Sequence, residues 1–211
     1  MTLSDFFFLA SVLMVLILIA CIAVAAAQGR KDKLRRLARS LGLFVAGYAL
    51  VLIAVALILP RRFHAPGERR CFDDWCIAAL SARAVESSTD QPCHAAPDSR
   101  SWVAVIEVSS VAKGTRQRAR DVGVELEDRE GRRYTPCAAP LLDGIGPRHL
   151  LSDELEPGGS FRVFLPFRLS DTAEPAGLVV HHGAFPSNVI IGDDQSFLHP
   201  PALLRIAFEK Q

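Results

Sequence analysis

The chain has 211 residues, half of which are hydrophobic, and its formal net charge at pH 7 is +1. The long apolar runs lie before residue 61, whereas Lys, Arg, Asp and Glu are interspersed over the rest. Such a balance leaves no basic stripe for a phosphate backbone to follow, so no nucleic acid is expected as a partner.

Two uncharged apolar runs come first, at residues 6–27 and 41–60. Each is long enough to cross the hydrocarbon core of a bilayer as a helix, which takes about 20 residues. Neither run has the polar stripe of a helix packed on a soluble core. The sequence therefore predicts a membrane hairpin over residues 1–60, with the lipid bilayer as a partner.

A basic loop at residues 28–40 joins the two predicted spans. Its six basic residues are Arg30, Lys31, Lys33, Arg35, Arg36 and Arg39. Because basic residues near membrane ends stay cytoplasmic, the prediction is a two-span protein of the bacterial inner (cell) membrane, with its N-terminus and C-terminal domain outside the cytoplasm. Four arginines that follow the second run, at positions 61, 62, 69 and 70, weaken this asymmetry. The loop is expected to contact anionic headgroups; a docking role for a cytoplasmic partner is the less favoured alternative.

Two alternatives concern processing of the first run. Ala25 and Ala27 form an A-x-A pattern typical of signal-peptidase sites, and Leu18 to Cys21 resembles a lipoprotein cleavage box. A secretory signal has a basic first region and a shorter apolar segment, whereas this chain has Asp5 and a long run. An uncleaved helix is therefore the prediction. Cleavage by signal peptidase, or lipidation at Cys21, would place the basic loop outside the cytoplasm and allow the second span to cross in the opposite direction.

After a linker at residues 61–70, short alternating runs separated by turn residues predict an extracytoplasmic β-sandwich over 71–211. Pro166 cannot donate to a ladder, so its run is expected to be an edge strand or a bulge. A turn at Asp128 to Gly131 predicts a hairpin. The expected strands cover 75–80, 101–111, both arms of the hairpin within 122–134, 160–169, 177–183, 188–192 and 202–208.

Four motifs in this domain follow one another in a recognisable order. They are "D-x-x-G-x-x-Y" at Asp128, Gly131 and Tyr134, then "LEPGGS" at 155–160, "VFLP" at 163–166 and "GLVV" at 177–180. Over residues 71–208 this order resembles the immunoglobulin-like extracytoplasmic domains of unknown function found in bacterial lipoproteins and membrane proteins. The resemblance implies a β-sandwich outside the cell membrane, without established catalytic residues. Together with the two predicted spans, the expected fold is two transmembrane α-helices followed by an all-β, immunoglobulin-like antiparallel sandwich. The chain departs from that pattern in its two spans and its His- and Asp-containing C-terminal segment.

Four of the five cysteines lie in the predicted sandwich, at Cys71, Cys76, Cys93 and Cys137. An even number in an oxidising compartment implies disulfides, and four cysteines allow three connectivities. The favoured hypothesis is 71–76 with 93–137, which requires residues 72–75 to turn, since an extended strand separates its ends by about 16 Å. A four-cysteine zinc site or a reactive thiol pair is the alternative, favoured only if the domain is cytoplasmic.

The C-terminal segment contains residue types that bind zinc or manganese. His181 and His182 are adjacent on a predicted strand and point to opposite faces, so only one of them fits a given site. The speculative metal set is His181, Asp193, Asp194 and His199. The two aspartates also suit a turn, and loop residues without a metal are the favoured interpretation, so no cofactor is expected.

Catalytic motifs are missing from the sequence: there is no nucleophile elbow and no phosphate-binding glycine loop. Glu125 and Glu127 are interpreted as a solvated strand face, and Trp75 and Trp102 as core residues rather than a sugar platform.

The predicted function is therefore a non-catalytic, membrane-anchored binding or scaffolding domain in an envelope protein complex. An exposed sheet edge would serve as the protein-binding surface. Gly42 and Ala46 form a small-xxx-small pair at which another helix can approach the second span. The alternative is an envelope metal-binding protein or metalloenzyme that uses the C-terminal His/Asp segment.

Overall fold

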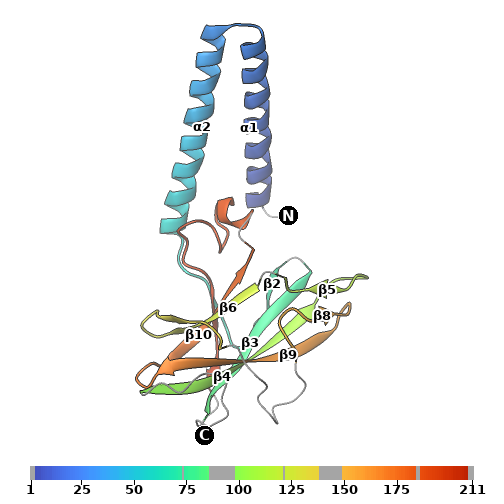
Figure 1. Cartoon of the computed structure of the whole chain (residues 1–211), viewed down its shortest axis with the longest axis vertical. Helices are drawn as coiled ribbons and strands as arrows, with labels where there is room; N and C mark the ends of the chain where they lie inside the picture. Colours follow the sequence, from blue (N-terminus) through green and yellow to red (C-terminus); the bar gives the residue numbers. More distant parts are fainter. Residues whose placement is uncertain are drawn as a thin grey trace. The chain divides into compact units, whose positions relative to one another are not determined.

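The computed structural model describes residues 3–72, 74–85, 98–120, 122–137, 149–183 and 186–208 (Figure 1). The chain divides into two compact units. The helical unit contains residues 1–61 together with 184–200, and the sandwich unit contains residues 62–183 and 201–211. Each unit is described by itself below.

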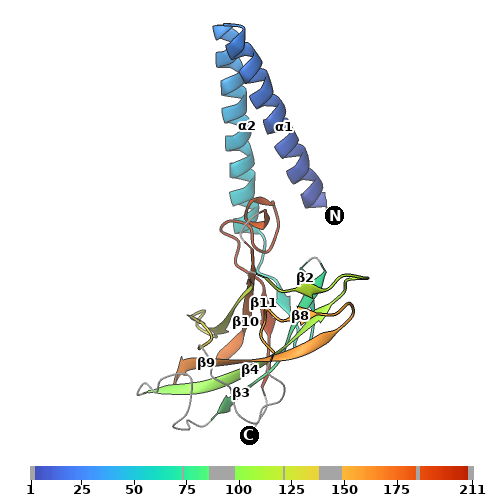
Figure 2. The same ribbon diagram turned by 45° about the vertical axis from the view of Figure 1, so that its right-hand side comes forward.

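The helical unit is built on two antiparallel helices, α1 (Leu3–Ala27) and α2 (Lys31–Ile58). Both are long and apolar enough to cross a membrane. Gly29 ends α1 with φ +66°, and the Gly29 and Arg30 N–H groups donate to Ala26 and Ala25, which is a Schellman cap. The two helices diverge from this turn toward their other ends (Figure 2).

The turn between the helices is shorter than the predicted basic loop of residues 28–40. Because α2 begins at Lys31, only Gln28 to Arg30 lie between the two helices. Leu, Lys, Arg and Ala favour helix, and Leu34 and Leu37 give this stretch a half-buried apolar face, so the helix extends back through the basic residues. Five of the six basic side chains therefore lie on the first three turns of α2.

Most apolar side chains of the helical unit face outward. Leu50 is 71 % exposed and Ile58 78 %, whereas Leu52 and Ala56 are buried. A soluble protein does not expose apolar surface on this scale without something to cover it.

The sandwich unit consists of twelve strands among the described residues. They are β1 (Phe63–His64), β2 (Arg70–Phe72), β3 (Trp75–Val85), β4 (Ser99–Ser110), β5 (Gln117–Arg118), β6 (Val122–Asp128), β7 (Arg133–Tyr134), β8 (Glu154–Leu155), β9 (Ser160–Ser170), β10 (Pro175–His182), β11 (Leu203–Arg205) and β12 (Ala207–Phe208). One sheet has the order β1-β11-β10-β6-β7, and the other β12-β3-β4-β9 with β2 paired to β3; β5 and β8 form a small third sheet.

The core lies between the two larger sheets. Ile77, Ile106 and Phe167 come from one sheet and Leu126 and Leu178 from the other, and all five are fully buried. Two apolar helices followed by a β-sandwich, as predicted, are therefore confirmed. The long pairings are antiparallel, but the short edge pairs β1–β11 and β12–β3 are parallel.

Both parallel pairs involve one C-terminal segment, which contributes to both sheets. Strand β11 joins the first sheet and β12 the second, with the buried Ile206 between them. Strand β1 lies inside the predicted linker of residues 61–70, so that linker contributes an edge strand to the sandwich.

The strand predicted at 188–192 is wrong. The structure has a 3-10 helix there, η1 (Ser187–Val189), followed by turns. Pro186 begins the helix by accepting from the Val189 N–H, and Gly192 has φ +80°. A short apolar run does not distinguish a strand from another buried segment, and in the helical unit this one has no strand partner among the described residues.

The predicted hairpin is present as β6 and β7, and its turn is organised by Asp128. This buried carboxylate accepts hydrogen bonds from the Glu130 and Arg132 backbone N–H groups at 3.0 and 2.8 Å, from Arg132 Nε at 2.7 Å and from the Tyr134 hydroxyl at 2.9 Å. Burial alone would raise the pKa of Asp128, but the hydrogen bonds from Arg132 and Tyr134 outweigh it and lower the pKa. The "D-x-x-G-x-x-Y" motif is therefore a stabilised turn.

Candidate functional site

Strand β9 forms one edge of its sheet. Its eleven residues pair with β4 alone in the sheet order, from Ser99↔Ser170 to Ser109↔Ser160. Pro166 lies within this strand, so the edge position predicted from the proline is confirmed.

The hydrogen-bond directions along β9 follow from Pro166. Its carbonyl accepts from the Cys137 N–H at 2.9 Å and so points away from β4. In an antiparallel pair the two backbone groups of one residue point the same way, and the direction alternates along the strand. Arg162 and Phe164 therefore direct their N–H and C=O groups outward as well, and Pro166 occupies a position where its missing N–H removes no bond to β4.

The outward backbone at Arg162 and Phe164 is open in the described part of the chain, since no hydrogen bond from the described residues reaches it. Arg162 is exposed and Phe164 half-buried on the face opposite the core. Unpaired N–H and C=O groups on a strand edge accept a further strand. This half of β9 is therefore suited to bind another extended segment.

The cysteine hairpin lies in the same sheet as β9. Strands β2 and β3 pair with Cys71 opposite Cys76, and a disulfide joins the two. The predicted first bridge is thus present, and its two sulfurs are not available as metal ligands. Cys137 is also disulfide-bonded. Cys93 lies outside the described residues, so the pairing of Cys93 with Cys137 stays a prediction.

The disulfide hairpin carries an aromatic cluster. Phe72 stacks on Trp75 with ring centroids 4.9 Å apart, and the His182 ring lies 5.3 Å from Phe72 and 5.2 Å from Trp75. Trp75 is buried, and Trp102 packs against the same core, so both tryptophans are core residues as predicted.

The speculative metal residues lie in different units. His181 is on β10 of the sandwich unit, where its Nε2 is 3.2 Å from Glu125 Oε2. Asp193, Asp194 and His199 belong to the helical unit. Over the residues that the structure describes, no group of three or more His, Cys, Asp or Glu is arranged to hold a metal ion.

Acidic and basic side chains form a network on the β6–β10 face. Arg133 Nε lies 3.3 Å from Glu127 Oε2, and Arg133 Nη1 lies 3.7 Å from Glu125 Oε2. Glu127 is buried, so the predicted solvated face holds for Glu125, which is partly exposed, but not for Glu127. A carboxylate at this depth needs a cation beside it, which Arg133 supplies. The network has the character of a structural ion pair.

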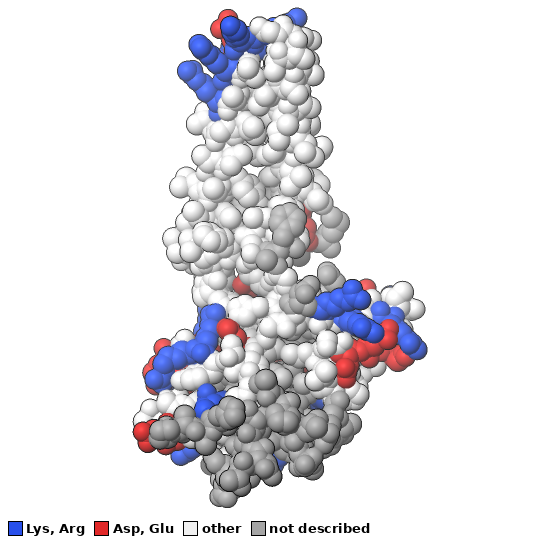
Figure 3. Space-filling model, viewed as in Figure 1, with Lys and Arg blue, Asp and Glu red and all other residues white. Residues whose placement is uncertain are grey.

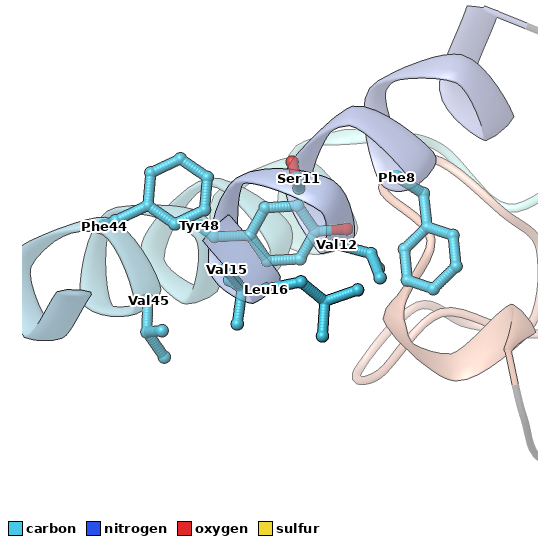
Figure 4. A pocket seen from close by; sticks show the side chains of 8 residues that line it. All are labelled: Phe8, Ser11, Val12, Val15, Leu16, Phe44, Val45 and Tyr48. Carbon is cyan, nitrogen blue, oxygen red and sulfur yellow. The ribbon is translucent and has the colours of Figure 1, made fainter. Parts of the chain in front are cut away.

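The helical unit carries two apolar grooves that share Ser11, Phe44 and Tyr48. The smaller, of about 190 Å³, lies between α1 and α2 (Figure 4) and is lined by Phe8, Ser11, Val12, Val15, Leu16, Phe44, Val45 and Tyr48. The larger, of about 580 Å³, is lined by Ser4, Phe7, Ser11, Leu43, Phe44, Gly47, Tyr48, Val51 and Ile191. Ile191 comes from the C-terminal part of the chain, so the helices and that segment share one surface.

The Lys and Arg residues of α2 and of the turn before it lie at one end of the helix pair. Figure 3 shows Lys and Arg side chains gathered at the turn between the helices, and uncharged side chains along most of the length that follows. Gly42 and Ala46 are exposed on α2, and a Cβ added to Gly42 would meet nothing within 4 Å. The pair does not face α1, so it is available to a helix from another chain.

Comparisons with known proteins identify a few similar structures. No family model and no curated protein matches the chain. A secreted protein of Mycobacterium tuberculosis, MPT63, is 12 % identical over 59 % of this chain and 92 % of its own, with a TM-score of 0.43. A conserved hypothetical protein of Bacillus anthracis is 15 % identical over 56 % of this chain and 88 % of its own, with a TM-score of 0.40. An uncharacterized β-sandwich protein of Clostridium difficile 630 is 12 % identical over 59 % and 88 %, with a TM-score of 0.35. Likeness this distant carries no argument about function, and the sandwich described above rests on its own sheets.

Two features of the helical unit were not predicted from the sequence. One is the contact in which the Tyr48 hydroxyl donates to the Val189 carbonyl at 2.6 Å. The other is the placement of the segment around Val189 beside the helices rather than in the sandwich. A tyrosine within an otherwise apolar span was the one available signal, because a buried phenol hydroxyl needs an acceptor.

Proposed function

We propose that this protein is a two-span membrane protein whose disulfide-bonded sandwich lies outside the cytoplasm and binds a partner protein of the cell envelope by strand addition to β9. The outward backbone at Arg162 and Phe164, which no hydrogen bond from the described residues reaches, carries the proposal. The family proposed for the sandwich is that of the immunoglobulin-like extracytoplasmic domains whose motifs the chain resembles.

Two observations support the topology. The disulfide between Cys71 and Cys76 suits a compartment outside the cytoplasm, where disulfides persist. The basic residues at the turn between α1 and α2 suit the cytoplasmic face. With both helices spanning, that turn is inside and the sandwich follows α2 outside.

The topology is tested by labelling intact cells with a membrane-impermeant maleimide. In a Cys21→Ala background, Glu130→Cys on the exposed β6–β7 turn is expected to react, and Lys33→Cys is expected to react only after lysis. The reverse pattern would place the sandwich in the cytoplasm. Labelling at both positions in intact cells would show that α2, which lies between them in the sequence, does not span the membrane.

Strand addition is tested with a photo-cross-linking residue at Ser160, which begins the open half of β9. A cross-linked partner is expected in cells that carry the otherwise unchanged chain. Arg162→Pro removes an outward N–H without removing a bond to β4, so it should abolish the adduct while the tryptophan fluorescence of the sandwich stays native. An adduct that survives Arg162→Pro at full yield would contradict pairing along this edge.

Val163→Pro is the matched control. The Val163 N–H points toward β4, so its loss breaks the internal ladder, and this variant should lose native tryptophan fluorescence as well as the adduct. The contrast between Arg162→Pro and Val163→Pro separates loss of binding from loss of folding.

A further inference from the structure

The segment at residues 186–200 is attached to the helices although more than a hundred residues separate it from them in the sequence. The Tyr48 hydroxyl donates to the Val189 carbonyl at 2.6 Å. A Cβ built on Gly192 would lie 3.8 Å from Leu59 Cδ1 and 3.9 Å from Ser4 Oγ. Ser4 is in the first turn of α1 and Leu59 follows α2, so the segment lies at the end of the helices opposite the basic turn.

Seven backbone N–H groups of the segment donate hydrogen bonds within it. Six of these N–H groups donate to backbone carbonyls of the same segment: Val189 to Pro186, Ile190 to Ser187, Asp193 to Ile190, Ser196 to Asp193, Phe197 to Asn188 and His199 to Ser196. The seventh, the Gln195 N–H, donates to Asp193 Oδ1. The Val189 carbonyl is bonded to Tyr48. Non-helical backbone is tolerated at membrane depth only when its polar groups are bonded in this way.

The tip of the segment presents two adjacent large apolar side chains. Phe197 is 59 % exposed and Leu198 54 %, whereas the flanking Ser196 and His199 are buried. Leu198 has φ +67°, a left-handed conformation that costs free energy for leucine and persists only where its surroundings hold it. The flanking hydrogen bonds of Phe197 and His199 provide that restraint. The tip is thus held in a shape that keeps both apolar side chains exposed.

We propose that the 186–200 segment is an interfacial membrane element that inserts Phe197 and Leu198 into the leaflet at the end of the helices opposite the basic turn. The proposal rests on the proposed function, because it takes α1 and α2 to span the bilayer. The tip would contact the boundary between the headgroups and the acyl chains of a lipid bilayer. Apolar side chains next to polar groups are stable at that boundary.

Continuity with the spans favours lipid as the partner of the tip. Exposed apolar side chains run along both helices, and Ile191 lines the same groove as Phe7 and Val51. Asp193 and Asp194 limit the depth, because carboxylates are costly in hydrocarbon. The expected position of the tip is therefore the headgroup level rather than the middle of the bilayer.

Spin labels on the full chain in lipid nanodiscs test this depth. Single cysteines are placed at Phe197 and Leu198 in a Cys21→Ala background, and collision rates with oxygen and with a water-soluble nickel chelate are compared. Leu50→Cys, in the middle of α2, is the control for a spanning position. Val111→Cys, on an apolar sandwich residue that is 49 % exposed, is the control for an exposed side chain that stays in water.

The labels at Phe197 and Leu198 are expected to show an oxygen-to-nickel ratio several-fold above that of Val111 and below that of Leu50. If the ratio at Phe197 and Leu198 equals that at Val111 while the ratio at Leu50 is high, the segment does not enter the membrane. That result overturns the inference and leaves the proposed spans intact. If Leu50 also matches Val111, the spans themselves are wrong and both proposals fail.

Discussion

Apolar side chains are mostly exposed in the helical unit and mostly buried in the sandwich unit. Leu50 of α2 is 71 % exposed, whereas Leu178 of β10 is fully buried between two sheets. In the sandwich, removal of apolar surface from water is the main stabilising term. In the helices most apolar side chains stay exposed, and backbone hydrogen bonds hold each helix by itself. The proposed bilayer around the helices accounts for this contrast.

This difference gives each unit its own spectroscopic signal. Trp75 and Trp102 both lie in the sandwich unit, so tryptophan fluorescence reports its unfolding. The long helices α1 and α2 dominate the far-ultraviolet dichroism at helical wavelengths. Each prediction below expects a change in the first signal and none in the second, with the full chain studied in detergent micelles.

The largest effect is expected from emptying the core between the sheets. Phe167→Ala removes a fully buried ring, so the free energy of unfolding of the sandwich should fall by about 3–5 kcal/mol. Phe197→Ala is the matched control in the helical unit, where the ring is mostly exposed and the change should stay within about 0.5 kcal/mol. Denaturant titration measures the change for Phe167→Ala by tryptophan fluorescence and the change for Phe197→Ala by helical dichroism. Equal losses would contradict the contrast between the units.

Glycine serves a different purpose in each unit. A Cβ on Gly177 of β10 would lie 2.6 Å from the Leu204 carbonyl oxygen and 2.8 Å from Leu203 Cγ, so Gly177→Ala must displace β11. We expect a loss of about 3 kcal/mol, at the upper end of the usual cost of overpacking. At Gly47 of α2 an added Cβ meets nothing within 4 Å, and Gly47→Ala should cost nothing. Denaturant titration decides, followed by tryptophan fluorescence for Gly177→Ala and by helical dichroism for Gly47→Ala, and a neutral Gly177→Ala would show that β11 is loosely held.

Asp128 makes the stability of the sandwich depend on acid. Asp128→Asn should lose about 2–3 kcal/mol at pH 7, because hydrogen bonds to a buried charged group are replaced by weaker ones. Since the folded pKa of Asp128 is lowered, its contribution is complete above the ordinary aspartate pKa of about 4 and is lost as the pH falls through the folded value. The difference in the free energy of unfolding between the parent chain and Asp128→Asn should therefore become smaller below about pH 4.

The control for this titration is Asp153→Asn. Asp153 accepts from the Leu150 N–H in a turn of the same unit but is partly exposed, so its replacement should lower the free energy of unfolding by less than that of Asp128 at pH 7. If the difference in the free energy of unfolding between the parent chain and Asp128→Asn stayed constant down to pH 2, Asp128 would not have the lowered pKa described above.

The smallest of these effects is expected from the short disulfide. Replacing Cys71 and Cys76 together by alanine opens a loop with a sequence separation of 5, which should cost the sandwich about 2 kcal/mol. Trp75 lies inside that loop, so its emission reports the change directly. A loss well above this value would indicate that the disulfide also holds the Phe72–Trp75–His182 cluster in place.

Local pattern was sufficient wherever neighbours in sequence decide the structure. The uncharged runs identified α1 and α2, period-two alternation identified β4 and β9, and the acidic turn at Asp128 identified the β6–β7 hairpin. Pro166 indicated the edge strand because the chemistry of its missing N–H is local. Pattern was not sufficient for residues 188–192, where a short apolar run was taken for a strand and proved to be η1 with the turns that follow it.

The sequence by itself determined the order of the two apolar helices and the sandwich, because hydrophobic periodicity and turn chemistry depend on residues a few positions apart. Only the tertiary structure decided which groups meet across long separations. It assigned His181 to one unit and Asp193, Asp194 and His199 to the other. Among the described residues it left the outward backbone of β9 without a partner at Arg162 and Phe164, and it joined the 186–200 segment to α2 through Tyr48. Such contacts are selected by the packing of whole elements against one another, which no local repeat encodes.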